Sequence, residues 1–244
     1  MPDLSKRVDV PELMDDFSIT DARLERALHE LRHVNRFLGG FRSIRKALES
    51  IVSVRSGESL RILDVGTGIA DIPASLVTWG AAHNVRITVT AVDANPVTVR
   101  YAIRTLDKRL SARLRNRVDV RVGDVRSLDY PEDSFDVVTA SLFLHHFDDE
   151  TVIHILREMN RISSIGLVVN DLHRHAAAYA GIEAIAYIMP VSQMFGHDGP
   201  ASVRRAFTPV ELYRLARNAD LPNVRIRRRW AYRLVLSTLP AQSN

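Results

Sequence analysis

Two glycines and a carboxylate meet where an apolar segment ends. Residues 61–73 read RILDVGTGIADIP, in which Asp64, Gly66 and Gly68 stand between an expected strand and an expected helix. Glycine lets the backbone approach a ligand closely and adopt dihedral angles that other residues avoid, and the first turn of a helix offers unpaired N–H groups. Because the carboxylate of Asp64 would repel a pyrophosphate in this turn, the pattern favours a ligand that carries positive charge.

Two further acidic residues follow the next expected strands. Asp93 ends the second strand in TAVDANP, where a carboxylate can accept hydrogen bonds from both hydroxyls of a ribose. Asp124 ends the third in RVGDVRSL, where it can accept a hydrogen bond from the amino group of an adenine. Open α/β sheets bind ligands at the carboxyl edge of their strands. Together with Asp64, these positions predict a site for a positively charged nucleoside such as S-adenosylmethionine, which carries an ammonium and a sulfonium.

The elements that must carry these residues alternate along the chain. Apolar strand-like segments are separated by stretches with helical spacing, a pattern typical of a parallel sheet covered on both faces. The last two strands read as a hairpin, so we predict an α/β, Rossmann-like sheet of seven strands with an antiparallel last strand. The expected strands are residues 59–65, 86–92, 118–124, 134–141, 165–171, 224–231 and 232–239, and the helices between them begin near 72, 96, 149 and 209.

Two helical regions lie outside this alternation. Residues 1–57 predict an N-terminal arm of helices, because apolar residues recur at helical spacing up to the pair Gly39-Gly40. The core is expected at 58–244, with a cap inserted at 172–207. Within the cap, an apolar helical stretch precedes GHDGPASVRR (196–205), whose glycines and proline predict a loop.

Composition narrows the function classes. The 244 residues are 46% hydrophobic and 25% charged, and they include no cysteine, which excludes disulfides, thiolate metal sites and a cysteine nucleophile. No secretory signal or membrane-length apolar run is visible, so we expect a cytoplasmic protein. The net charge of +4 is mostly arginine, dense at 100–117 and 225–229. Nucleic acid could use these segments, although solvated helix and strand faces explain them more simply.

The glycine turn, Asp93 and Asp124 make residues 58–171 resemble the class I S-adenosylmethionine-dependent methyltransferases, and the architecture extends the likeness to the C-terminus. Ala70 departs from the fullest glycine pattern of that family. A nicotinamide Rossmann domain and a cofactor-binding regulator without catalysis are the alternatives. The resemblance implies S-adenosylmethionine as cofactor and S-adenosylhomocysteine as product. The implied cofactor-binding residues are Asp64, Gly66, Thr67, Gly68, Asp93, Ala94, Asp124, Val125 and Ser141.

Candidate catalytic residues follow the fourth strand, in TASLFLHHFDDE. His145 and His146 are expected to overlook the reactive methyl group, and Asp171, at the end of the fifth strand, can hold one imidazole in the tautomer that accepts a proton. This combination resembles natural-product O-methyltransferases with a His–Asp general base, and which histidine is the base stays open. The adjacent acidic cluster 148–150 reads as helix capping, so no metal is predicted.

The acceptor is expected to be a small aromatic or hydrophobic molecule with a hydroxyl group. Aromatic and sulfur-containing side chains of the cap and arm are expected to line an apolar slot: Tyr179, Tyr187, Met189, Met194, Phe195, Phe17, Phe37 and Phe41. C-methylation of a quinone-like ring and RNA methylation are alternatives. The missing N-P-P-Y and D-P-P-Y sequences argue against planar amino groups as acceptors. A homodimer is expected, since the arm can cap its own site or a partner's.

Overall fold

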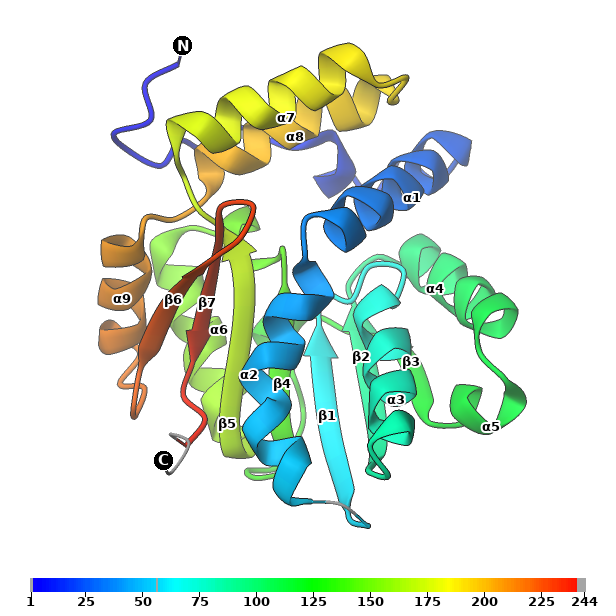
Figure 1. The fold of residues 1–244 in the computed structure, drawn as a ribbon. Helices are drawn as coiled ribbons and strands as arrows, with labels where there is room; N and C mark the ends of the chain where they lie inside the picture. The colour runs from blue at the N-terminus through cyan, green and yellow to red at the C-terminus, as the bar shows by residue number, and fades with distance from the viewer. Residues whose placement is uncertain (1, 56, 241–244) are drawn as a thin grey trace.

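A seven-stranded sheet forms the centre of the molecule (Figure 1). The computed structural model describes residues 2–55 and 57–240; residues 1 and 56 of the predicted arm and 241–244 of the predicted core lie outside the described residues. The strand order is β3-β2-β1-β4-β5-β7-β6, with β1 to β5 parallel and β7 antiparallel to both of its neighbours. The predicted sheet with an antiparallel last strand is therefore confirmed. The strands are β1 (Ser59–Val65), β2 (Arg86–Asp93), β3 (Val118–Val122), β4 (Phe135–Ser141), β5 (Ser163–Leu172), β6 (Arg225–Arg229) and β7 (Arg233–Ser237).

Helices cover both faces of this sheet. The helices α2 (Gly40–Val54), α3 (Asp71–Ala82) and α4 (Pro96–Arg109) pack on one face, while α6 (Asp149–Arg161) and α9 (Pro209–Asn218) pack on the other. Side chains of successive strand residues point to opposite faces. In β1, Ile62 therefore packs in the core under α2, α3 and α4, and Leu63 packs in the core under α6 and α9. Each fully buried aliphatic side chain stabilises the fold by about 1.5–3 kcal/mol.

Polar residues at the helix starts satisfy the free N–H groups of the first turns. Asn95 Oδ1 accepts from Val97 at the start of α4, and Asp148 Oδ1 accepts from Thr151 at the start of α6. Thr208 and Glu211 form a reciprocal capping box at α9. The acidic cluster at α6 thus has the capping position that the sequence predicted for it.

A third layer lies over the carboxyl ends of the strands (Figure 1). It contains the helices α1 (Ala22–Phe37), α7 (Ala176–Ile188) and α8 (Gln193–Arg205), with the short 3-10 helix η1 (Leu13–Asp15). By contrast α2, the other helix of the predicted arm, packs against β5 and β7, and the boundary of the arm stays a prediction. Within the described residues, no helix combines the length and hydropathy needed to cross a bilayer.

The prediction of a loop at 196–205 is wrong, because α8 includes this segment and carries Pro200 in its interior. Ser192 starts the helix by accepting from the Phe195 N–H. A Cβ on Gly199 would lie 2.8 Å from Ile182 Cγ1, so this glycine serves the close packing of α8 on α7. Helix packing thus explains Gly199, while the structure gives no such contact for Gly196.

Two further helix boundaries complete the fold. The helix expected to begin near 96 ends at Arg109, and α5 (Ala112–Arg115) follows as a separate turn. At the arm, α2 begins at Gly40, directly after Gly39, which has a φ of +76° and turns the chain from α1 into α2.

Candidate active site

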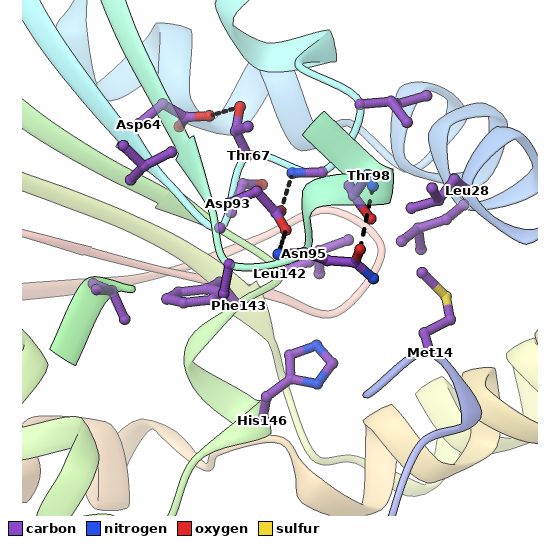
Figure 2. Close-up of a pocket in the computed structure, with 18 of the residues that line it drawn as sticks. Met14, Leu28, Asp64, Thr67, Asp93, Asn95, Thr98, Leu142, Phe143 and His146 are labelled. Atoms are coloured by element: carbon purple, nitrogen blue, oxygen red, sulfur yellow. Dashed lines mark hydrogen bonds between the residues drawn. The ribbon is translucent and has the colours of Figure 1, made fainter. Parts of the chain in front are cut away.

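The glycine turn opens onto a cavity of about 670 Å³ above the ends of β1 to β4 (Figure 2). The cavity combines residues at the ends of these four strands with side chains from α1 and η1. In Figure 2, His146 and Met14 lie across the pocket from Asp64 and Thr67. All nine predicted cofactor residues line it: Asp64, Gly66, Thr67, Gly68, Asp93, Ala94, Asp124, Val125 and Ser141.

Asp64 is held at the floor of this pocket by two threonines. Its Oδ2 accepts from Thr67 Oγ1 at 2.7 Å and its Oδ1 from Thr139 Oγ1 at 2.6 Å. Burial raises the pKa of Asp64 to about 7; the two hydrogen bonds oppose this rise, while the charges of Asp71 and Asp93 add to it. A buried carboxylate with so raised a pKa is one that a cationic ligand would stabilise in its charged form.

The other two predicted carboxylates differ in rigidity and exposure. Asp93 Oδ2 accepts from the Gly68 N–H at 2.9 Å and Oδ1 from the Asn95 N–H at 3.0 Å, which ties the β2 end to the glycine turn (Figure 2). Burial raises the pKa of Asp93. Asp124 is more exposed and its carboxylate receives the backbone N–H and guanidinium of Arg126, which lower its pKa. Asp93 therefore has the more rigid position.

The turn requires glycine for two different reasons. Gly66 has a φ of +62°, and a Cβ there would lie 2.0 Å from Phe143 Cδ2; Gly68 has a φ of +54° but open space around it. Ala70, the departure from the full glycine pattern, adopts the left-handed conformation as the N-cap of α3. This conformation costs an L-residue roughly 1–2 kcal/mol. The backbone of the turn keeps its left-handed geometry at this position although the residue is an alanine.

The structure pairs His145 with Asp171. His145 belongs to the 3-10 helix η3 (Leu144–His146), and its Nδ1 lies 2.6 Å from Asp171 Oδ1 on β5. The two residues are 2% and 0% exposed. Burial alone would raise the pKa of Asp171, but the charge and hydrogen bond of His145 lower it. Asp171 also accepts from the backbone N–H groups of His145 and Leu172, at 3.3 and 2.7 Å. This arrangement orients one imidazole rigidly.

His146 has different partners and a different exposure to the cavities. Its Nδ1 lies 2.8 Å from Asp15 Oδ1. Burial would lower its pKa, but Asp15 and the charge of Glu12 outweigh burial and raise it. His146 lines the cofactor-side cavity and a second cavity, whereas His145 lines only the second. Asp171 lines neither and acts from behind His145.

The arm supplies a site residue, Glu12, that no sequence motif indicates. Glu12 is buried, and its Oε1 lies 3.7 Å from His145 Nε2 and 3.9 Å from His146 Nδ1 without a hydrogen-bond partner among the described residues. Nothing in the segment PELMDD signals this position, because contacts far along the chain create it. These three residues each place a ligand atom within 4.8 Å of the others, and the absence of a metal stays a prediction.

Arginine and aspartate side chains fix the arm over the histidines. Arg205 donates to the carbonyl oxygens of His145, His146 and Val10. Asp198 accepts from the backbone N–H groups of Leu13 and Met14, at 2.8 and 3.0 Å. Since each link joins segments distant in sequence, the wall of the site depends on tertiary structure.

The second cavity has a volume of about 700 Å³ and lies beneath α7 and α8. It shares four residues with the first: Met14, Leu31, Leu142 and His146. The predicted aromatic slot is largely wrong, because of its eight residues only Phe195 lines this cavity. Tyr187, for example, is 92% exposed. Small and branched side chains of the helices line it instead, among them Val34, Ala178, Ile182 and Ile185.

The remaining histidines of the region are divided between this cavity and the surface. His173 and His175 line the cavity, and the ring of His175 stacks on Tyr232 at 4.8 Å. His197 points instead to Asp198, 2.8 Å from its Oδ1.

A sheet of this strand order, with a carboxylate-and-glycine turn after its first strand and an acidic residue after its second, defines the fold of the class I S-adenosylmethionine-dependent methyltransferases. The buried carboxylates of the first cavity fit the ammonium and ribose of this cofactor, and the apolar side chains Ile69, Val92 and Val125 in its wall fit an adenine ring.

Comparison with known proteins agrees with this assignment. Residues 62–166 match the protein family described as a methyltransferase domain. The 27-O-demethylrifamycin SV methyltransferase of Amycolatopsis mediterranei (strain S699) is 31% identical over 141 residues, which are 57% of this chain and 47% of that protein. The chain therefore spans about half of the length of this curated relative.

Two solved structures show the same fold at low identity. A SAM-dependent methyltransferase from Aquifex aeolicus has a TM-score of 0.59 and 15% identity, and the match covers 88% of this chain and 97% of that one. An O-methyltransferase family 2 protein from Planctomyces limnophilus in complex with apigenin has a TM-score of 0.63 and 13% identity, with coverages of 91% and 63%. The chain thus has the fold of the class I S-adenosylmethionine-dependent methyltransferases and contains a match to a methyltransferase domain, which indicates S-adenosylmethionine as cofactor; its place in the first cavity stays a prediction.

Proposed function

We propose that this protein methylates a hydroxyl group of a small hydrophobic acceptor, with His145 as the general base. The observation that carries the proposal is the buried His145–Asp171 pair, 2.6 Å between Nδ1 and Oδ1, in the wall of a cavity that adjoins the cofactor pocket. A hydroxyl is a poor nucleophile until it loses its proton, so a base beside the acceptor is the feature that such a reaction needs.

His145 and Asp171 have different roles in the proposed reaction. Asp171 accepts from the Nδ1–H of His145, so that Nε2 is the nitrogen available for the acceptor's proton. Asp171 is thus a positioning residue. When bound, S-adenosylmethionine supplies a methyl group on a sulfonium: the carbon–oxygen bond forms as the carbon–sulfur bond breaks, and S-adenosylhomocysteine leaves. Alignment of acceptor and methyl group contributes much of the rate in such a displacement.

The second cavity supports a small acceptor. Its volume of about 700 Å³ lies within the usual range for ligand sites, about 300–1,000 Å³. Its wall of aliphatic residues would bury an aromatic ring or alkyl chain. The names of the similar proteins point to the same chemistry, since one concerns 27-O-demethylrifamycin SV and another was solved with the phenol apigenin. RNA methylation stays an alternative: in the two arginine-rich segments, Arg115 contacts Asp107 and Arg225 donates to the carbonyl oxygens of Leu239 and Pro240, while other arginines of these segments carry no such contact among the described residues.

The test is turnover with a panel of hydroxylated acceptors that includes apigenin and 27-O-demethylrifamycin SV, followed by substitution of single histidines. We expect His145→Gln to lower kcat by about 10²–10⁴-fold while the Kd for S-adenosylmethionine stays unchanged in isothermal titration. His83→Gln, at an exposed position that lines neither cavity, is the control. Equal activity of His145→Gln and the wild type would contradict the proposal. NMR of the product separates O-methylation from methylation of a ring carbon.

A further inference from the structure

One wall of the second cavity is built from cationic side chains. The hairpin of β6 and β7 contributes Arg228, Arg229 and Arg233, which we call the arginine wall, and His173 and His175 lie beside it at the end of β5. These residues come from the C-terminal hairpin and the start of the cap. The proposed mechanism gives these cationic side chains no role.

Arg233 is the most unusual of them. It is 1% exposed, and its Nε and Nη1 atoms are buried without a hydrogen-bond partner in the described part of the chain. Among the described residues, no carboxylate oxygen lies within 4.0 Å of a nitrogen of Arg233, so Arg233 forms no ion pair there. Burial lowers the pKa of Arg233 to about 10, against the charges of Asp171 and Asp71, so the guanidinium still carries its charge at neutral pH. Burying a charge without a partner is costly.

The neighbours of Arg233 do not neutralise it. Arg229 also has a buried Nε without a partner among the described residues. The pKa of Arg229 is lowered mainly by burial and also by the charge of Arg227. The charge of Glu49 raises this pKa but does not cancel the other two effects. The pKa of His173 is lowered first by burial and then by His175, Arg228 and Arg174, all cationic when protonated. The wall therefore has a positive potential.

The carboxylates of the same cavity belong to its other wall. Asp198 is occupied by the N–H groups of Leu13 and Met14. Glu12 faces the imidazoles of His145 and His146. The cavity is thus divided into an arm side, where the acceptor hydroxyl would meet the base, and a hairpin side that carries unpaired guanidinium groups.

We infer that the arginine wall binds a carboxylate group of the acceptor, so that the substrate is a hydroxylated aromatic or alicyclic carboxylic acid. A guanidinium presents planar donors that match a carboxylate and form charge-assisted hydrogen bonds with it. Such a group would give the guanidinium groups of Arg233 and Arg229 a counter-charge that the described residues do not provide, and would fix which hydroxyl of the acceptor reaches His145. This inference rests on the proposed function, because it assigns the second cavity to the acceptor.

The test is binding of positional isomers of hydroxynaphthoic acid to the full chain saturated with S-adenosylhomocysteine, compared with the corresponding carboxamides. The acid and the amide share ring and hydroxyl and differ in charge. For at least one isomer, isothermal titration should give a Kd about tenfold or more lower for the acid, as expected for a charge-assisted contact in a buried site. Equal affinities across the panel, or no binding of any acid, would overturn the inference.

Substitutions locate the effect. Arg229→Gln should remove most of the preference for the acid, and Arg233→Gln should remove it altogether. Arg227→Gln is the matched control, because it removes the same charge from an exposed position of the same strand and does not line the cavity. Should Arg233→Gln fail to fold, the double variant Arg228→Gln/Arg229→Gln replaces it. An equal loss of the preference for the acid in Arg227→Gln would show that the preference comes from net charge in general, and would refute the carboxylate site.

The same panel separates this inference from the proposed function. Methyl transfer to acids and amides at equal rates would remove the carboxylate site and leave the O-methyltransferase proposal intact. Tight, charge-dependent binding of the acid without methyl transfer to any acceptor would do the reverse. A phenol with a second hydroxyl in place of the carboxyl distinguishes a phenolate from a carboxylate as the preferred anion.

Discussion

The two cavities of the molecule are built in different ways. The first cavity, which we assign to the cofactor, is formed mostly by the turns that follow β1, β2, β3 and β4, so most of its residues lie next to the end of their own strand, and the arm adds the rest. The second cavity, which we assign to the acceptor, is collected from the arm, η3, the end of β5, the cap helices and the C-terminal hairpin. A common fold thus determines the first cavity almost locally, while the second depends on how distant additions pack over the sheet.

The two cavities also carry opposite charge. Asp64 and Asp93 are buried carboxylates at the floor of the first, which suits a cationic cofactor. The hairpin side of the second carries guanidinium groups without partners among the described residues. Since the cavities meet at Leu142 and His146, the boundary between these environments is also the place where methyl group and acceptor would meet. Substitutions in one cavity should therefore show whether ligand binding in the other cavity is independent of it.

The largest expected effect is that of Asp171→Asn, which acts on the acceptor side alone. The substitution keeps the shape of the side chain but removes the charge that orients His145 through the 2.6 Å contact. We expect kcat to fall by about 10²–10⁴-fold, the size of a general-base contribution, with little change in the acceptor KM or in the Kd for S-adenosylmethionine. Steady-state kinetics and titration measure the three quantities. A proportionate loss of cofactor affinity would show that the cavities are not independent.

The second prediction affects the cofactor side alone and uses a matched pair of glycines. Gly66→Ala places a Cβ 2.0 Å from the ring of Phe143 at a φ of +62°, whereas Gly68→Ala meets open space at a φ of +54°. We expect the Kd for S-adenosylmethionine to rise roughly 30-fold or more for Gly66→Ala, because overpacking costs about 1–3 kcal/mol beyond the backbone strain. The rise for Gly68→Ala should be about fivefold, from strain of about 1 kcal/mol. Similar losses for both would mean that backbone strain, and not the contact with Phe143, requires glycine at 66.

The third prediction is a pH dependence of cofactor binding that Asp64 causes. Its pKa of about 7 in the fold lies above the ordinary 3.8, so the folded state without cofactor binds more protons than the unfolded chain between these values. The free energy of unfolding of the cofactor-free protein should therefore fall as pH rises from about 4 to 7 and then level off. A cationic ligand favours the ionised carboxylate, so affinity should rise by roughly tenfold between pH 6 and 8.

Titration at several pH values checks this dependence, with Asp64→Asn as the reference. The variant removes the titrating group and should show a flatter profile of both affinity and stability. Its remaining slope gives the contribution of the cofactor's own groups. An unchanged slope in Asp64→Asn would assign the pH dependence to another residue.

The contrast between the cavities explains what the sequence could predict. Asp64, Asp93 and Asp124 were visible because a strand end places a side chain at a known edge of the sheet, whatever the rest of the chain does. The pairing of a histidine with Asp171 was predictable for the same reason, but the choice of His145 depended on the turn of η3. Glu12 was invisible, since contacts between distant segments, among them those of Arg205 and Asp198, bring the arm to the histidines. Pro200 and Gly199 misled because packing of α8 on α7 overrides their local preference for a loop.

The smallest expected effect concerns the attachment of the arm to the cap. Asp198→Ala removes the acceptor for the N–H groups of Leu13 and Met14, which lie beside Glu12 and in the boundary between the cavities. We expect the free energy of unfolding to fall by about 1–3 kcal/mol, the cost of leaving buried donors unsatisfied. The acceptor KM should rise roughly threefold as the arm opens more often, while the cofactor Kd changes less. Hydrogen exchange at the amides of Leu13 and Met14 should accelerate in this variant and remain slow in Asp9→Asn, which removes the same charge from an exposed position of the arm. Because Leu13 and Met14 lie next to Glu12, which faces the histidines from the second cavity, the acceptor KM should respond more than the cofactor Kd; the opposite result would show that the arm serves mainly the first cavity, which Met14 also lines.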